Sequence, residues 1–321
     1  MSRRLTAAAA ALALAGSPAE AYVRSTSSSG LCLWWSTRQV HYAVNDFTVN
    51  AAASVCSSSL PDPAGQAYTK VRDGFATWSA AGGCTDLSLV PERTSSTATG
   101  LDCQNLVVFR RGLCSALIPS GDPCRLWDVS GSSTLNCADK HNCWDTDDPS
   151  HADARVIALT TVSYVESSGE IVDADMELNA WDGSGPAPPG YYFTCLDPPA
   201  TSCGLVPGQS NCIATDVQNV VTHEAGHVLG LGHQAGVPTA TMYPSAPAGE
   251  TTKRTLDPDD ISGICAIYPA AAPTDVCIGT GQVATRPSSA CPQPSGCGCG
   301  TAGAEGWFAL AALLLWRRRS A

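Results

Sequence analysis

Three histidines within eleven residues constrain the fold of this chain more than any other feature of its sequence. His223 and His227 are four residues apart, so a helix would direct both imidazoles to one side. Gly230 can take the left-handed conformation that ends a helix, and the chain can then turn to bring His233 to the same point. The spacing therefore predicts a helix, a tight turn and three converging imidazoles.

Such a trio suits a catalytic metal site. Three imidazoles leave the fourth position of a tetrahedral zinc open for water, and zinc lowers the pKa of that water toward about 7. Glu224 follows His223 directly and points along a different vector, so we expect it to act as general base and then as general acid. A metal site without catalysis is the alternative. Glu224 counts against that alternative, because a binding module needs no base beside its metal.

The helix that carries the histidines has further support. Thr215 and Gln218 have the spacing of a capping box at its start. A stripe of small apolar residues follows at helical spacing and is expected to be buried: Val217, Val221, Ala225 and Val228.

The segment from His223 to His233 resembles the HExxHxxGxxH motif of the metzincins. The resemblance implies that Met242 forms an apolar floor under the imidazoles. Met242-Tyr243-Pro244 is most similar to the matrixin branch, and residues 256–264 resemble the matrixin Leu-x-x-Asp-Asp-Ile-x-Gly-Ile pattern. The matrixin resemblance implies an α+β fold: a mixed twisted sheet with a helix, the zinc helix and a C-terminal helix. The implied activity is hydrolysis of peptide bonds in protein or peptide substrates.

Four departures limit this resemblance. Residues 22–39 are too short for the usual inhibitory pro-region and contain no Pro-Arg-Cys-Gly, so latency is unexplained, and Cys32 is expected to be a disulfide partner. His151 and Asp153 fit the first ligands of a structural zinc, but no histidine lies between them and His223, so we expect no such zinc. The substrate-pocket wall runs Pro-Ser-Ala instead of Pro-x-Tyr, so side-chain preference does not transfer.

The fourth departure concerns calcium. Asp173, Asp175 and Glu177 alternate along one face of a predicted strand. Carboxylates in this arrangement can bind Ca²⁺, but we favour a solvated strand face.

Composition narrows the class of protein. The chain has 18 Lys and Arg against 29 Asp and Glu, a formal charge of −11, which disfavours nucleic acid as a partner. Sixteen cysteines indicate an oxidising compartment. Twelve lie between Cys32 and Cys265 and allow up to six bridges, while Cys277 and Cys291 can close a loop further on. Residues 110–155 contain four cysteines and are predicted to be a disulfide-stapled insertion; zinc binding there is the weaker alternative.

Apolar patterns predict the remaining elements. Residues 66–80 have the spacing of an amphipathic helix. Strands are expected at residues 40–45, 87–90 and 105–109, and in a hairpin formed by residues 156–165 and 170–178. Together they indicate a mixed α+β domain.

The two ends are typical of targeting segments. Residues 1–21 have the charged, apolar and small-residue parts of a secretory signal, which leaves a domain at 22–269 and a Pro/Gly/Ser-rich linker at 270–300. Residues 301–321 contain an apolar run, too short to cross about 30 Å of hydrocarbon, and then three arginines. With Cys297 and Cys299, this region resembles the myxobacterial C-terminal sorting tail; a plain short anchor is the alternative.

The tail resemblance implies a hydrophobic helix, with Cys297 or Cys299 as the processing or lipid-attachment site, and association with the cell envelope. The sequence as a whole predicts a zinc endopeptidase that is secreted and either anchored at the bacterial cell surface or outer membrane, or released. The alternative is a cell-surface binding or adhesion protein that keeps the fold without turnover.

Overall fold

The structure is a computed structural model. It describes residues 22–46, 55–56, 61–81, 83–125, 137–145, 155–181, 190–201 and 212–277, and the backbone of 307–315. The expected signal segment, Cys297 and Cys299, and the His151–Asp153 pair lie outside the described residues, as does most of the linker.

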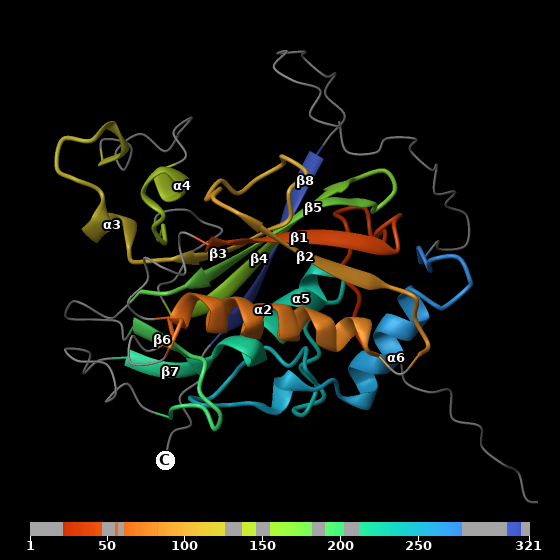
Figure 1. The fold of residues 1–321 in the computed structure, drawn as a ribbon. Helices are drawn as coiled ribbons and strands as arrows, with labels where there is room; N and C mark the ends of the chain where they lie inside the picture. The colour runs from red at the N-terminus through yellow and green to blue at the C-terminus, as the bar shows by residue number, and fades with distance from the viewer. Residues whose placement is uncertain are drawn as a thin grey trace, which may run out of the picture.

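A six-stranded sheet forms the centre of the domain (Figure 1). Its order is β2-β1-β3-β5-β4-β8. The first four strands of this order run parallel to one another, while β4 is antiparallel to both of its neighbours. The bounds are β1 Gln39–Asn45, β2 Ser88–Thr94, β3 Leu106–Arg110, β4 Val156–Val165, β5 Ile171–Asn179 and β8 Trp307–Leu315. The five strands expected from the sequence are confirmed, and the sheet is mixed.

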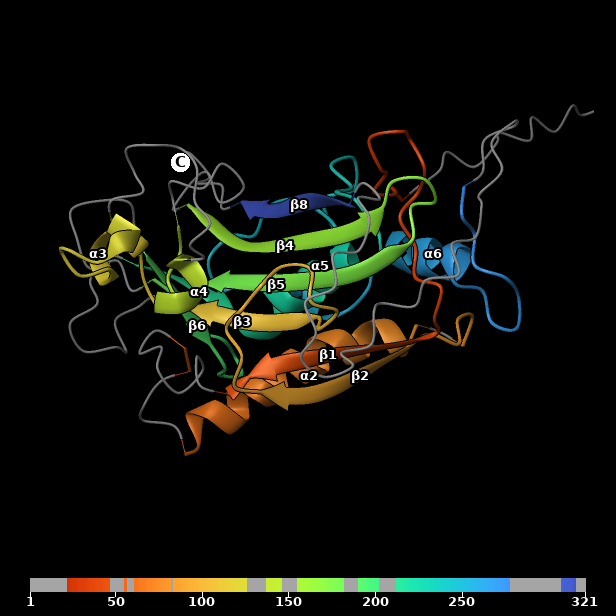
Figure 2. The same cartoon turned by 90° about the horizontal axis from the view of Figure 1, so that it is seen from above.

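Two helices, α2 (Pro63–Ser79) and α5 (Val217–Val228), pack together on one face of the sheet (Figures 1 and 2). They approach closely because Gly74 has no side chain: a Cβ there would lie 2.8 Å from Val221. The indole N–H of Trp78 donates to the carbonyl of Thr222 at 2.7 Å. This contact fixes α2 against the helix that carries the histidines.

The remaining elements lie mainly on the same side of the sheet. Helix α6 (Pro258–Ile267) begins with a capping box, in which the Asp257 side chain accepts backbone N–H groups and the Asp260 side chain accepts the N–H of Asp257. Strands β6 (Gly190–Thr194) and β7 (Cys212–Asp216) form a parallel pair, and η3 (Thr252–Arg254) precedes α6. The expected C-terminal helix of the domain is therefore confirmed.

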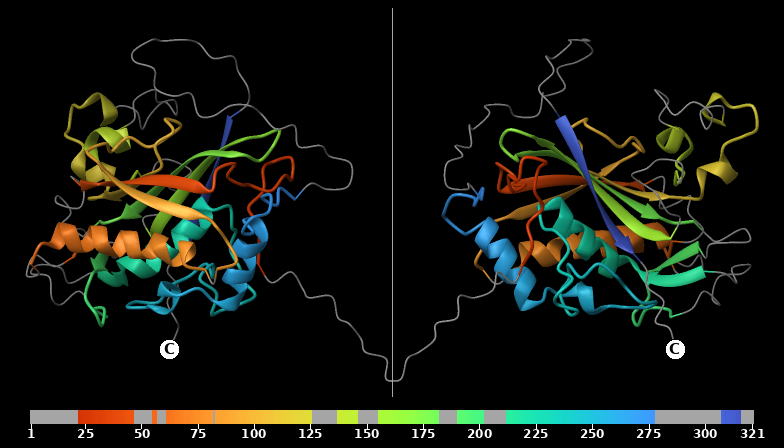
Figure 3. Two further views of the ribbon diagram at one scale, coloured as in Figure 1. Left: turned by 45° about the vertical axis from the view of Figure 1, so that its right-hand side comes forward. Right: turned by 180° about the vertical axis from the view of Figure 1, so that it is seen from behind.

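The cysteine-rich insertion has its own small core. It contains α3 (Cys114–Leu117), η1 (Pro123–Arg125) and α4 (Cys137–His141), and it lies beside one end of the sheet (Figure 3). Disulfides join Cys114 to Cys143 and Cys124 to Cys137, and these four sulfurs are buried together. The insertion is stapled by disulfides, as expected. The same bonds exclude these four thiols as zinc ligands.

Long-range disulfides between described residues tie the domain together. Cys56 pairs with Cys195, Cys84 with Cys265, and Cys32 with Cys277. The expected loop between Cys277 and Cys291 was wrong, because Cys277 closes the domain onto its N-terminal segment. Sequence distance favoured the nearer cysteine, whereas the fold brings Cys32 to a Cα–Cα distance of 5.5 Å from Cys277. Cys277 is thus joined covalently to the N-terminal segment of the domain.

The acidic face of β5 is buried, and the expectation of a solvated face was wrong. Asp173 accepts the backbone N–H groups of Asp102 and Cys103, while Asp175 accepts those of Gly100 and Leu106. Desolvation by burial raises the pKa of Asp173 to about 6. These carboxylates hold the loop before β3 against the sheet.

Glu177, the third acid of this face, pairs with the buried guanidinium of Arg110. Arg110 also pairs with Asp139 of α4 at 2.7 Å, so it links the insertion to β5. The acids alternate as the sequence shows, but a loop and the insertion cover the face that they form.

The C-terminal apolar segment forms a strand where the tail resemblance implies a helix. Residues 307–315 pair with β4 at the edge of the sheet (Figure 2). Among the described residues, no helix has the length and apolar character needed to cross a bilayer.

Candidate active site

Helix α5 begins at the end of β7 and carries two of the three histidines. Its N-cap is Asp216, whose carboxylate accepts the N–H of Asn219 at 2.7 Å. The expected capping box of Thr215 and Gln218 was wrong by one residue, because Thr215 is still part of β7. The expected stripe of small apolar residues is buried. The strand-to-helix transition thus sets where His223 and His227 lie.

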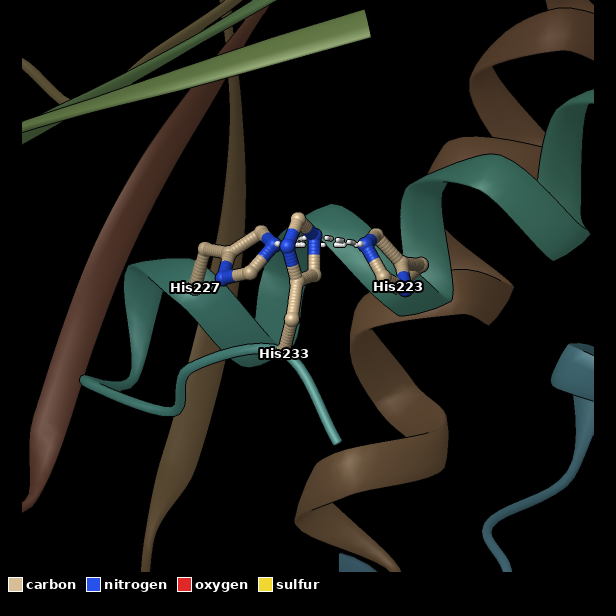
Figure 4. A group of neighbouring side chains, drawn as sticks. All are labelled: His223, His227 and His233. Carbon is tan, nitrogen blue, oxygen red and sulfur yellow. Dashed lines mark hydrogen bonds between the residues drawn. The ribbon is translucent and has the colours of Figure 1, made fainter. Parts of the chain in front are cut away.

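The three histidines converge on one point (Figure 4). Their Nε2 atoms form a triangle in which each pair is 3.2 Å apart. Gly230 makes the return of His233 possible, since its φ is +86° and a Cβ there would lie 2.5 Å from the carbonyl oxygen of Leu33. In a tetrahedral zinc site with Zn–N bonds of about 2.0–2.1 Å, ligand nitrogens are about 3.3 Å apart. The triangle fits a single small cation.

The protons of the rings fit the same cation. Nδ1 of His223 lies 2.6 Å from the carbonyl oxygen of Thr241, and Nδ1 of His227 lies 2.8 Å from that of Leu231. A carbonyl oxygen only accepts, so these Nδ1 atoms carry the protons and both Nε2 atoms present lone pairs. Lone pairs 3.2 Å apart repel one another unless a cation lies between them. These two carbonyls therefore orient the rings for metal binding.

The environment keeps the imidazoles neutral. Burial lowers the pKa of His227 to about 3, with His233 adding to the effect. Burial also holds the pKa of His223 well below its usual value, and the other two histidines lower it further. Neutral imidazole is the form that binds metal.

Glu224 follows His223 directly on α5 and is completely buried. Its Oε2 accepts the hydroxyl of Thr160 on β4 at 2.6 Å, and its Oε1 has no hydrogen-bond partner among the described residues. Burial raises the pKa of Glu224 to about 8, while the Thr160 hydrogen bond opposes that rise. Thr160 was missed by sequence reasoning, because nothing local relates one threonine in a strand to a helix 64 residues away.

Met242, which the metzincin resemblance implies as an apolar floor, packs against Gly226 of α5. A Cβ at Gly226 would lie 2.2 Å from the Met242 sulfur, so Gly226 leaves space for the thioether between the two histidines of α5. Asp260 of α6 accepts the N–H groups of Thr241 and Met242 at 2.6 and 3.2 Å. Since Thr241 also holds His223, α6 supports the metal site through this turn.

A second group of potential ligands, in the insertion, does not form a comparable site. Asp122, Cys124 and His141 lie near one another. The Cys124 sulfur is bonded to Cys137, and Nε2 of His141 lies 3.3 Å from the Asp122 carboxylate. The disulfide and the close contact between His141 and Asp122 account for this group.

The structure thus combines a mixed sheet, two helices packed on one face of it and three converging histidine nitrogens. Residues 138–269 match the family model of the matrixins. Over these residues the chain is similar to the matrixins, in agreement with the resemblance of its histidine motif.

Individual relatives match over a short segment. Metalloendoproteinase 1-MMP of Arabidopsis thaliana is 44% identical over 59 residues, 18% of this chain and 16% of that protein. Metalloendoproteinase 1 of Glycine max is 49% identical over 55 residues, 17% of each chain. Matrilysin of Rattus norvegicus is 47% identical over 49 residues, 15% of this chain and 18% of that protein. The chain thus spans less than a fifth of these curated relatives.

Proposed function

We propose that this chain is a zinc-dependent endopeptidase. The observation that carries the proposal is the triangle of Nε2 atoms, 3.2 Å on each side, two of them from the helix that also carries the buried Glu224. His223, His227 and His233 would hold the ion, and its chemistry there is that of a Lewis acid that polarises the scissile carbonyl and makes water more acidic.

In this proposal Glu224 moves the proton. Its unpartnered Oε1 accepts a proton from the attacking water and later delivers it to the leaving amine. Thr160 holds Oε2, so the carboxyl cannot rotate freely between those two steps.

The edge of β4 is the natural place for an extended substrate. This strand lies over α5, and Thr160 joins it to Glu224. A peptide added there as a further strand would place its backbone beside the histidines, and backbone pairing is largely independent of sequence. We therefore propose a protein or peptide substrate and leave its side chains unspecified.

The test measures zinc content and peptidase activity on the same preparation. The chain is expressed under oxidising conditions, its zinc is measured by elemental analysis, and casein or a quenched peptide is the substrate. We expect one zinc per chain in the wild type and in Glu224→Ala, and loss of zinc in His227→Ala. Chelation should abolish cleavage. Glu224→Ala should lower the cleavage rate by about 100-fold or more.

The alternative function, a cell-surface binding protein, makes the opposite prediction for activity. A wild type that holds zinc and cleaves no peptide at any concentration would support it. Loss of zinc from the wild type would contradict both readings.

We propose one catalytic zinc and no calcium on β5. Four backbone N–H groups already occupy the carboxylates of Asp173 and Asp175, and Ca²⁺ would have to displace them. Calorimetric titration with Ca²⁺ tests this point.

We further propose secretion through residues 1–21 and association with the cell envelope through the C-terminal tail. Mass spectrometry of the mature protein should find residues 307–321 missing, or Cys297 or Cys299 modified. An intact, unmodified terminus in the culture medium would contradict the anchor.

A further inference from the structure

Strand β4 borders the candidate active site and has one side that does not pair with β5. β5 occupies its other side, and Thr160 in the middle of β4 donates to Glu224. A substrate that adds to the sheet must use the side of β4 that faces away from β5.

The chain itself occupies that side. β8 runs antiparallel along β4, with Trp307 opposite Val165 and Leu315 opposite Val156. Ala312 lies opposite Thr160, so the middle of β8 passes the point where β4 holds Glu224. Seen from behind, β8 crosses the domain next to α5 (Figure 3, right), and the two elements are in contact. One strand edge pairs with one partner strand at a time, so β8 and an added substrate exclude each other.

The sequence of β8 suits a reversible contact. Its nine residues, WFALAALLL, contain no charge, proline or glycine to oppose pairing at an edge. Alanine and leucine are among the best helix formers, so the pairing with β4, and not local propensity, holds the segment extended. Residues 278–306 tether it to the domain, and a tether of this kind gives an effective concentration on the order of millimolar.

We propose that β8 is an intramolecular competitor of the substrate: it covers the β4 edge and keeps the enzyme latent until the C-terminal segment is removed or withdrawn. The proposal rests on the proposed peptidase function. This form of control requires no Pro-Arg-Cys-Gly segment. It also gives the apolar tail a role before its processing.

Proline substitutions in the full chain test the contact. Consecutive residues of a strand direct their N–H groups to opposite sides, so either Ala311→Pro or Ala312→Pro removes a donor that faces β4. The matched control is Ala304→Pro, which lies before the strand. Hydrogen–deuterium exchange of the amides of residues 157–164 reports the pairing without any need for activity, and peptide cleavage reports its consequence.

We expect at least one of the two strand variants to speed amide exchange in β4 while the control matches the wild type. If β8 covers the edge in about nine of ten molecules, the same variant lowers KM roughly tenfold and leaves kcat unchanged. Equal exchange in the wild type and both strand variants overturns the proposal, as does faster exchange with an unchanged KM. Faster exchange in a protein that holds zinc but cleaves nothing supports the strand contact and overturns the proposed function instead.

Discussion

At the scale of single residues, backbone carbonyls and small side chains hold the chemical groups in place. The carbonyls of Thr241 and Leu231 fix the rings of two histidines. Gly226 leaves the space in which the Met242 sulfur lies. Each of these groups acts by positioning a neighbouring side chain.

Thr160 offers a test of such a positioning role. Thr160→Val removes the hydroxyl bound to Glu224 and leaves both carboxyl oxygens without a partner. We expect kcat/KM to fall by about 5- to 30-fold, the equivalent of about 1–2 kcal/mol, with zinc content unchanged. Steady-state kinetics and elemental analysis measure both. Thr161→Val is the control, since the next residue of the strand points to the other face; an equal loss there would contradict the assigned role.

At the scale of elements, the first turn of α6 is joined to the turn that contains Thr241 and Met242. Asp260 accepts N–H groups from Asp257, Thr241 and Met242, so one carboxylate both caps the helix and holds the turn. Its neighbour Asp259 is also buried, but neither of its carboxyl oxygens has a partner among the described residues. Burial, followed by the charges of Asp260 and Asp257, raises the pKa of Asp259 to about 6.

Asp259 therefore predicts a pH dependence of stability. A carboxyl whose pKa is higher in the folded state stabilises the protein below the unfolded pKa of about 4, and this contribution is lost as pH rises through about 6. Asp259→Asn lacks that linkage. We expect the Tm of the variant minus the Tm of the wild type to increase as pH rises from 4 to 7. Thermal unfolding at each pH measures this difference. Parallel curves for the two proteins would contradict the raised pKa.

At the scale of the whole molecule, disulfides join segments that are distant in sequence. Cys32–Cys277 spans 245 residues and ties the N-terminal segment to the chain beyond α6, whereas Cys124–Cys137 spans 13 within the insertion. In the chain-entropy account, a longer closed loop restricts the unfolded state more strongly.

The two bonds can be compared directly. Replacing both cysteines of the long bridge by serine should lower the free energy of unfolding by roughly 5 kcal/mol, against roughly 3 kcal/mol for the short bridge. Urea unfolding of both double variants measures the difference. Zinc content should survive loss of the short bridge, because the insertion has its own core. A larger loss from the short bridge would show that the insertion supports the domain more than its separate core suggests.

The sequence contained most of the site because the geometry there is local. Two histidines four residues apart share a helix face wherever that helix forms, and a glycine three residues later permits the return of His233. Strand and helix patterns located β1 to β5 and α2 for the same reason. The start of α5 was misplaced by one residue, since two polar residues before Val217 both fit a cap and only the end of β7 distinguishes Asp216 from Thr215.

These patterns could not predict contacts between segments that are distant in sequence. Alternation showed that Asp173, Asp175 and Glu177 share a face, but the loop that covers this face comes from 70 residues earlier in the chain. The partners of Cys277 and of Glu224 likewise lie 245 and 64 residues away. The pairing of β8 with β4 belongs to the same class. Periodicity reports which side of an element is apolar or polar, while the packing of distant segments determines what covers it.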